Sequence, residues 1–286
     1  MIIRDVEASA VEDLALAPPR AALAATVDNE IYVLPISVSV RDPAEPAGSP
    51  RIVRVPADTP NLADRNVVVI ADDGPQWFRL RSLTVRGTAT AMGDRSYGVI
   101  PKRVVAWDYG SLRYVATPPD AAHPRPPSFS GAVDNDVGPL RSLNLEVVLS
   151  ASRVMILATR SGNGTPFAVP LWFVAHQGRI YTTTAASSWT VRNVAACPQV
   201  AILFGGDRGH DTDRVLVRGR ARAVPGMPPA AVLAQIAWRY YLHPRFAAVE
   251  LRHMRLWGRR MRYYAQSQPA HVIITPHSAT ECSART

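Results

Sequence analysis

The stretch NVAACPQVAILFGGDRGHDTDRVLVRGRARAV, residues 193–224, decides the fold of this chain because an earlier stretch repeats it. Residues 61–92, NLADRNVVVIADDGPQWFRLRSLTVRGTATAM, align with it at a constant offset (61 against 193), and no gap is needed. Val68 then matches Val200, and each copy carries the same Val-Arg-Gly tripeptide, which ends at Gly219 in the later copy. A fixed internal offset over this length is the signature of a duplicated structural unit.

The segments on either side of this stretch repeat as well. Residues 23–40 resemble residues 156–174, with a proline at the same place in both. Residues 99–107 lie over residues 273–282, again with a proline in common, at positions 101 and 276. The chain therefore reads as two copies of one unit.

Each unit is predicted to consist mainly of β-strands. In the second copy, runs rich in β-branched and aromatic residues predict strands over residues 154–159, 167–175, 180–183, 200–204 and 214–223. Glycine and asparagine at 161–164 predict a hairpin turn, because both residues tolerate positive φ. Short strands at regular spacing are typical of a barrel or a sandwich. Short helices are expected over residues 143–151 and 188–195.

The two copies are expected to be separate domains joined by a linker. Five prolines between Tyr114 and Gly138 predict an extended, semi-rigid connection. Apolar residues at helical spacing after Pro228 predict a helical insert in the second copy. The expected organisation is a first repeat at 1–113, a linker at 114–138, and a second repeat at 139–286 with the insert at 227–266.

The composition narrows the class of protein. The chain has 286 residues, of which 47% are apolar, so it can bury a core and is not disordered. It has no signal-peptide core and no apolar run of about 18 residues, so a cytoplasmic protein without membrane spans is expected. Two cysteines exclude a disulfide framework and a zinc site built from cysteines alone. The net charge of +9 rests on arginine, with Lys102 as the sole lysine, which indicates compositional bias rather than nucleic-acid binding but leaves anionic ligands open.

The second copy resembles the FMN-binding split β-barrel family, which includes pyridoxamine 5′-phosphate oxidase and its flavin- and deazaflavin-dependent relatives. The resemblance rests on the order of three segments: LATRSGNGTPFAVPLWFV (157–174), IYTTTAASSWTVRNVAACPQVAIL (180–203) and VLVRGRARAV (215–224). It implies a mainly β fold in which two split β-barrels of one chain face each other as an intramolecular pseudo-dimer. It also implies a flavin-dependent oxidoreductase that binds FMN in a cleft between the two repeats.

The same resemblance implies where the cofactor sits. The family places the flavin phosphate at the turn after the third strand, commonly within a Ser-Arg-Lys stretch that falls here on Ser188, Trp189 and Thr190, so both basic residues are missing. Arg192 and Arg214 are the candidates to replace them, and hydroxyls come from Thr182, Thr183, Thr184, Ser187 and Ser188. Pro170, Trp172 and Trp107 are expected as further cofactor contacts. The wall on the first-copy side is expected to include Trp77, Arg79 and Arg81 beside Trp107.

The first copy is expected to have lost its own site. Residues 55–61, at the position of the hydroxyl-rich turn, contain Asp58 and two prolines. An acid repels a phosphate, and each proline removes an amide donor. One working cleft per chain is therefore expected, with its phosphate end in the second copy.

Other interpretations of these residues stay open. The serine and threonine cluster also fits a strand end followed by a helix cap, and the tryptophans also fit a core. The missing basic pair favours an alternative function, a non-enzymatic or haem-binding split-barrel protein that serves as scaffold, carrier or regulator. The cofactor alternatives to FMN are therefore the deazaflavin F420 and haem, the latter with His253, His271 or His277.

The sequence names no catalytic residue; Arg214 and Tyr181 are the nearest candidates to polarise a flavin or substrate. The loop at 205–213 gathers three aspartates and a histidine, but such loops are common turns and no metal is expected. The partner implied is a small-molecule substrate, an anionic one included, with neither membrane nor nucleic acid. The chain itself is expected as a monomer or a homodimer.

Overall fold

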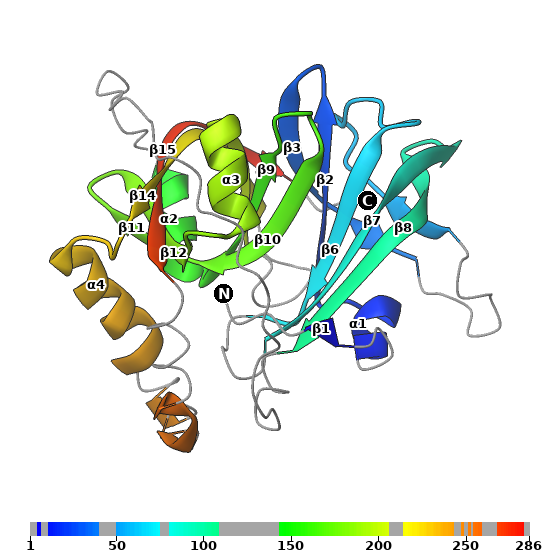
Figure 1. Ribbon diagram of the computed structural model, residues 1–286. Coiled ribbons are helices and arrows are strands. Elements are labelled where there is room, and N and C mark those ends of the chain that lie inside the picture. The colour runs from blue at the N-terminus through cyan, green and yellow to red at the C-terminus, as the bar shows by residue number, and fades with distance from the viewer. Residues whose placement is uncertain are drawn as a thin grey trace.

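The computed structural model describes residues 5–6, 11–39, 50–74, 80–108, 143–205, 214–242, 247–248, 251–252, 254–258 and 268–282. These residues form two curled antiparallel sheets that lie side by side (Figure 1). The expected linker at 114–138 lies outside the described residues. The chain is mainly β, with two split barrels in one polypeptide, as the sequence predicts.

The two sheets have the same strand order. The first follows β3-β2-β6-β7-β8-β5-β4, with β1 (Asp5–Val6) paired to β8. Its strands are β2 (Arg20–Val27), β3 (Glu30–Pro35), β4 (Ser37–Val38), β5 (Arg51–Arg54), β6 (Asn66–Asp72), β7 (Arg81–Gly93) and β8 (Ser96–Asp108). The second follows β10-β9-β13-β14-β15-β12-β11. Its strands are β9 (Val154–Arg160), β10 (Pro166–Trp172), β11 (Val174–His176), β12 (Arg179–Ala185), β13 (Gln199–Phe204), β14 (Arg214–Pro225) and β15 (Pro269–Cys282). Apart from β1, each strand of the first sheet has its counterpart at the same place in the second, so the duplication is confirmed.

A β-bulge recurs at the same glycine in both repeats. The register shifts at Gly87 in the β7–β8 pair and at Gly219 in the β14–β15 pair, each opposite one of the two aligned prolines. A Cβ atom on Gly219 would lie 2.8 Å from the carbonyl oxygen of Thr275, and one on Gly87 would overlap the carbonyl oxygen of Ile100. The Val-Arg-Gly tripeptide is therefore a structural requirement, since only glycine allows this approach.

The structure corrects the gap-free alignment by one residue. Val67 pairs with Gly87, whereas Val200 pairs with Gly219, so Val67 and not Val68 is the counterpart of Val200. Val67 and Val200 both point into the core of their own barrel. Because side chains alternate between the two faces of a strand, a slip of one residue would turn the core face outward. Packing of the core therefore fixed the register of this strand. The segment from Val200 to Gly219 is one residue shorter than the segment from Val67 to Gly87.

An apolar core joins the two repeats. It contains small or β-branched residues from both sheets: Ala22, Ala24, Ile31, Val33, Val68, Ile70, Ile156, Ala158, Ala168, Ala201 and Leu203. These side chains point away from the two barrel interiors, and alanines let the backbones of the sheets come close. The pseudo-dimer interface is therefore apolar at its centre.

Short helices complete the fold. Helix α1 (Glu12–Leu16) precedes the first sheet, and α2 (Leu143–Ala151) precedes the second with the predicted bounds. Helix α3 (Trp189–Ala196) follows β12, one residue from the predicted range. The insert begins with α4 (Ala230–Ala237), continues in a π-helical turn, η4 (Trp238–Leu242), and has a 3-10 turn, η5 (Met254–Leu256). No helix among the described residues has the length and apolarity that crossing a membrane requires.

The insert covers the outer face of the second sheet. Its Val232 and Tyr240 pack against Val174, Tyr181 and Ile273 in a cluster separate from the barrel core. In Figure 1 the insert lies at the edge of the molecule farthest from the first repeat. The outer face of the second sheet thus packs against the first repeat in one region and against the insert in another.

Candidate functional site

The turn between β12 and α3 carries the hydroxyl cluster. Ser188 is the N-cap of α3, and its Oγ accepts a hydrogen bond from the Val191 amide at 3.2 Å. Thr182 is buried, and its Oγ1 donates to the carbonyl of Trp172 at 2.7 Å. Two of the five hydroxyls therefore have structural partners, which matches the cap interpretation for Ser188.

Two other groups at this turn are buried and lack partners. Neither the Thr184 Oγ1 nor the Arg192 Nη2 finds a hydrogen-bond partner in the described part of the chain. The Arg192 guanidinium lies over the Trp189 ring, 5.0 Å from its centroid. Thr183 is exposed and Ser187 half-buried. A hydroxyl and one guanidinium nitrogen without partners on adjoining elements suit an oxyanion, because buried donors are costly without an acceptor.

Arg214 lies far from this turn. It pairs with Cys282 at one end of the β14–β15 ladder, while Pro225, at the other end of β14, pairs with Ala270 beside the end of β12. The Arg214 Nη1 donates to the Ala21 carbonyl of the first repeat at 3.2 Å. Burial, and then nearby Arg20, lower the pKa of Arg214. The structure therefore brings Arg192 to the hydroxyl cluster but not Arg214.

Trp172 packs against the insert. Its ring stacks on Tyr240 with centroids 4.4 Å apart and an interplanar angle of 8°. The Tyr240 hydroxyl donates to the Phe173 carbonyl at 2.6 Å and accepts from the Phe173 amide at 3.0 Å. Burial raises the pKa of Tyr240 to about 12. Tyr181 joins the same cluster, and Pro170 is buried within β10. The insert thus uses Trp172 as its docking surface.

Of the four residues expected in the wall from the first repeat, the structure describes Arg81 and Trp107. Arg81 forms ion pairs with Asp13 at 2.7 Å and Asp73 at 2.6 Å inside its own repeat. Trp107 is buried in β8 opposite Ser82. Trp77 and Arg79 lie outside the described residues. Other arginines make the polar contacts between the two repeats.

Arginines that the sequence interpretation missed hold the repeats together. The Arg20 Nη1 donates to the Val154 carbonyl at 3.3 Å, the Arg160 Nη1 to Asn29 at 2.7 Å, and the Arg218 Nη1 to Glu30 at 2.6 Å. A signal for one of them was present in the sequence. Arginines at 214, 218, 220 and 222 alternate along β14, so they share the face opposite the barrel core. That alternation marks a basic row on the face that meets the first repeat.

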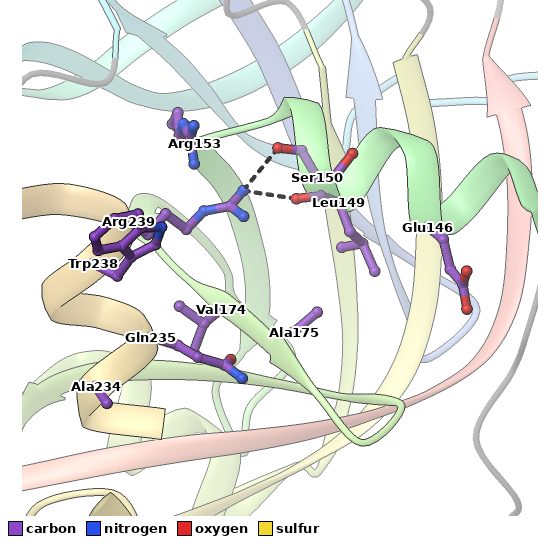
Figure 2. A pocket seen from close by; sticks show the side chains of 10 residues that line it. All are labelled: Glu146, Leu149, Ser150, Arg153, Val174, Ala175, Ala234, Gln235, Trp238 and Arg239. Atoms are coloured by element: carbon purple, nitrogen blue, oxygen red, sulfur yellow. Dashed lines mark hydrogen bonds between the residues drawn. The ribbon is translucent and has the colours of Figure 1, made fainter. Parts of the chain in front are cut away.

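A cavity of about 710 Å³ lies between α2, β11 and the insert (Figure 2). Arg239 crosses its upper side and donates to the Leu149 carbonyl at 2.7 Å and to the Ser152 carbonyl at the end of α2. A cation at a helix C-terminus is favourable because it meets the negative end of the helix dipole. The exposed Trp238 indole lines the same cavity. None of the predicted cofactor residues lines it, so this cavity belongs to the insert.

The remaining candidate ligands of a metal or haem are dispersed. His271 is buried, and its Nδ1 lies 3.1 Å from the Gly226 carbonyl, whereas His277 is exposed. His253 and the aspartates and histidine of the loop at 205–213 lie outside the described residues. Among the residues that the structure describes, no three His, Cys, Asp or Glu side chains gather in a way that could hold a metal ion.

Comparison with known proteins bears on the second repeat. Residues 144–258 match the family model described as pyridoxamine 5′-phosphate oxidase. No curated protein matches the chain.

Solved structures resemble about half of the chain. A conserved hypothetical protein from Mycobacterium tuberculosis is 22% identical, with 52% of this chain and 88% of that chain covered and a TM-score of 0.37. HutZ, the haem storage protein from Vibrio cholerae, is 18% identical, with 48% and 91% covered and a TM-score of 0.36. An FAD-binding protein from Mesorhizobium loti is 21% identical, with 50% and 96% covered and a TM-score of 0.34.

The matched residues run from α2 into the insert and enclose the β12–α3 turn. The strand order, the bulge at the glycine of the Val-Arg-Gly tripeptide and the capped helix after β12 all lie in the repeat that the family model matches or in its duplicate. The second repeat therefore matches the pyridoxamine 5′-phosphate oxidase family model over residues 144–258, and the first repeat duplicates its strand order.

Proposed function

We propose that this chain binds FMN at the β12–α3 turn of its second repeat and acts as a flavin-dependent oxidoreductase on a small organic substrate. One observation carries the proposal: the Thr184 Oγ1 and the Arg192 Nη2 are buried without a hydrogen-bond partner in the described chain, at the turn where the family resemblance places the flavin phosphate. A phosphate group supplies the acceptors that both groups lack.

The residues at the turn divide the task. Arg192 takes the place of the missing basic pair. The Thr184 hydroxyl donates a hydrogen bond to a phosphate oxygen. Thr183 and Ser187 remain accessible for further hydrogen bonds, while Ser188 caps α3 and fixes its orientation. Bound flavin would supply the two-electron chemistry, and the protein binds and orients it.

One site per chain follows from the difference between the repeats. Residues 55–65, between β5 and β6, form no helix, whereas α3 stands at the equivalent place in the second repeat. Asp58 in this segment opposes a phosphate electrostatically. We therefore place the cofactor in the second repeat alone.

The basic row on β14 supports an anionic substrate. Arg218, Arg220 and Arg222 share one face of the strand, beside the first repeat. Guanidinium groups bind carboxylate and phosphate groups with two parallel hydrogen bonds. Arg220 and Arg222 are the residues of this row that we assign to substrate recognition, because Glu30 already pairs with Arg218.

The test is reconstitution followed by absorption spectroscopy. The purified chain is titrated with FMN, with F420 and with haem, and the stoichiometry is measured; FMN at one per chain is expected. Arg192→Ala should weaken FMN binding by about 1–3 kcal/mol, since a charge-assisted hydrogen bond is lost. Arg214→Ala, checked for folding by circular dichroism, is the matched control and should leave FMN affinity unchanged.

The same titrations discriminate the alternatives. A folded protein that binds no flavin would overturn the proposal and favour a non-enzymatic scaffold or regulator. Haem binding with displacement of FMN would favour a haem carrier. Two FMN molecules per chain would mean that the first repeat binds phosphate despite Asp58.

A further inference from the structure

Two arginines occupy equivalent positions in the two repeats and reach across to the opposite repeat. Arg86 on β7 and Arg218 on β14 each directly precede the glycine of the bulge. The Arg86 guanidinium lies over the Phe167 ring at 5.2 Å, and the Arg218 guanidinium lies over the Tyr32 ring at 4.5 Å. The two contacts are related by the pseudo-twofold symmetry of the duplicated fold, as in an isologous dimer.

The Arg218 contact is electrically neutral. The Arg218 Nη1 lies 2.6 Å from Glu30 Oε2, and the Tyr32 hydroxyl donates to the same carboxylate at 3.2 Å. Burial acts to lower the pKa of Arg218, but its hydrogen bonds with Tyr32 and Glu30 outweigh burial and raise it. On the neighbouring strand, Ser278 stands opposite Arg218. This site therefore contains one cation and one anion.

The Arg86 contact lacks every one of these polar partners. Glu30 lies two residues before Tyr32, and Thr165 is the residue two positions before Phe167, with its hydroxyl bonded to Asn163 at 3.0 Å. Phe167 has no hydroxyl, in contrast to Tyr32. On the neighbouring strand Arg103 stands opposite Arg86, where the second repeat has a serine. Compared with the Arg218 site, the Arg86 site thus lacks a carboxylate and a tyrosine hydroxyl and has a second arginine in place of a serine.

The result is a pair of unneutralised cations. The Arg86 Nε is buried without a hydrogen-bond partner, and no carboxylate contacts Arg86 within the described ranges. Burial lowers the pKa of Arg86, and the charge of Arg103 lowers it further. Like charges directly opposite each other on neighbouring strands are destabilising. Arg86 is half-buried and Arg103 beside it is exposed, so the pair can be reached from solvent.

We propose that Arg86 and Arg103 form a binding site for an oxyanion, a phosphate or carboxylate group of a small molecule, which takes the place that Glu30 occupies beside Arg218. The anion bonds to the guanidinium groups from the solvent side, while Phe167 supports the opposite face of Arg86. The site is separate from the β12–α3 turn, because it is formed by β7, β8 and the start of β10. It does not depend on flavin binding.

Thermal unfolding in increasing inorganic phosphate, at constant ionic strength set with chloride, tests this site, and an acetate series is the carboxylate arm. The midpoint of unfolding should rise with phosphate in a saturable way, since a ligand that binds the folded state stabilises it. Arg86→Gln should weaken the apparent phosphate affinity about tenfold or more. Arg192→Gln, which alters the β12–α3 turn, should leave this component of the response intact.

The equivalent position in the other repeat supplies a second, independent variant. Thr165→Glu installs the carboxylate that Glu30 provides at the other site, so it should raise the midpoint without phosphate and remove the phosphate response. Glu30→Thr should create a new response at Arg218. An unchanged phosphate response in Arg86→Gln, or a Thr165→Glu variant with a lower midpoint and full phosphate dependence, would overturn the proposal. Should Arg86→Gln not fold, Thr165→Glu alone decides.

Discussion

Replacing Asp72 by asparagine should destabilise the whole pseudo-dimer. The Asp72 carboxylate is fully buried and lies 2.6 Å from the Arg20 Nη2, and the Arg20 Nε reaches both carboxylate oxygens at 3.1 Å. The same guanidinium bonds to the Val154 carbonyl of the other repeat, so the ion pair sits at the junction of the two barrels. Asp72→Asn keeps the shape of the side chain but removes the negative charge that lies against the buried Arg20 guanidinium.

The magnitude follows from that burial. Only 2% of Arg20 is exposed, and removal of one partner from a buried pair costs about 3–5 kcal/mol because the other charge stays in a low dielectric. Arg214 lies close enough for Arg20 to lower its pKa, with Asp72 acting in the opposite direction. Asp72→Asn therefore removes the charge that balances two arginines. We expect the free energy of unfolding to fall by about 3–5 kcal/mol.

Urea unfolding followed by circular dichroism measures this loss. Asp28→Asn makes the same chemical change in an exposed pair, where Arg65 lies 3.8 Å away, and should shift the urea midpoint little. The double variant Arg20→Met/Asp72→Leu should recover part of the lost stability, because it removes both charges. A loss below about 1 kcal/mol in Asp72→Asn would refute the reasoning, since it would mean that water reaches the Arg20 charge.

Three further predictions follow from single contacts. Burial raises the pKa of Tyr240 to about 12, so the neutral Tyr240 side chain should stabilise the fold fully below about pH 10. This stabilisation should be lost as the pH rises towards 12. The urea midpoint should therefore fall over this pH range in the wild type, and Tyr240→Phe should not show that fall. Gly87→Ala should cost about 1–3 kcal/mol in urea unfolding, because the new Cβ overlaps the Ile100 carbonyl, whereas Gly258→Ala, with no atom near the new Cβ, should not destabilise. Arg239→Gln should release the insert from α2, detected as faster amide exchange over both elements; unchanged exchange would show that the Tyr240 contacts suffice.

The candidate site could be predicted only in part. The hydroxyl-rich turn lies between a strand and a capped helix that carries Arg192, as the sequence predicts, because this pattern is local. Arg214 was the other candidate to replace the missing basic pair at this turn. The β14–β15 ladder places it at the opposite end, a consequence of strand pairing that spacing alone does not contain.

Sequence alone determined the duplication, the strand and helix positions and the family resemblance of the second repeat, since these depend on periodicity, turn residues and local order. Helix α2 has the predicted bounds for this reason. Tertiary structure decided the one-residue register between Val67 and Val200, because only packing distinguishes the core face of a strand from its outer face. It also decided the partners of the arginines. Arg81 and Arg218 are both strand arginines in the sequence, yet one is neutralised within its own repeat and the other by Glu30 across the interface, because burial and neighbours come from segments far apart in the chain.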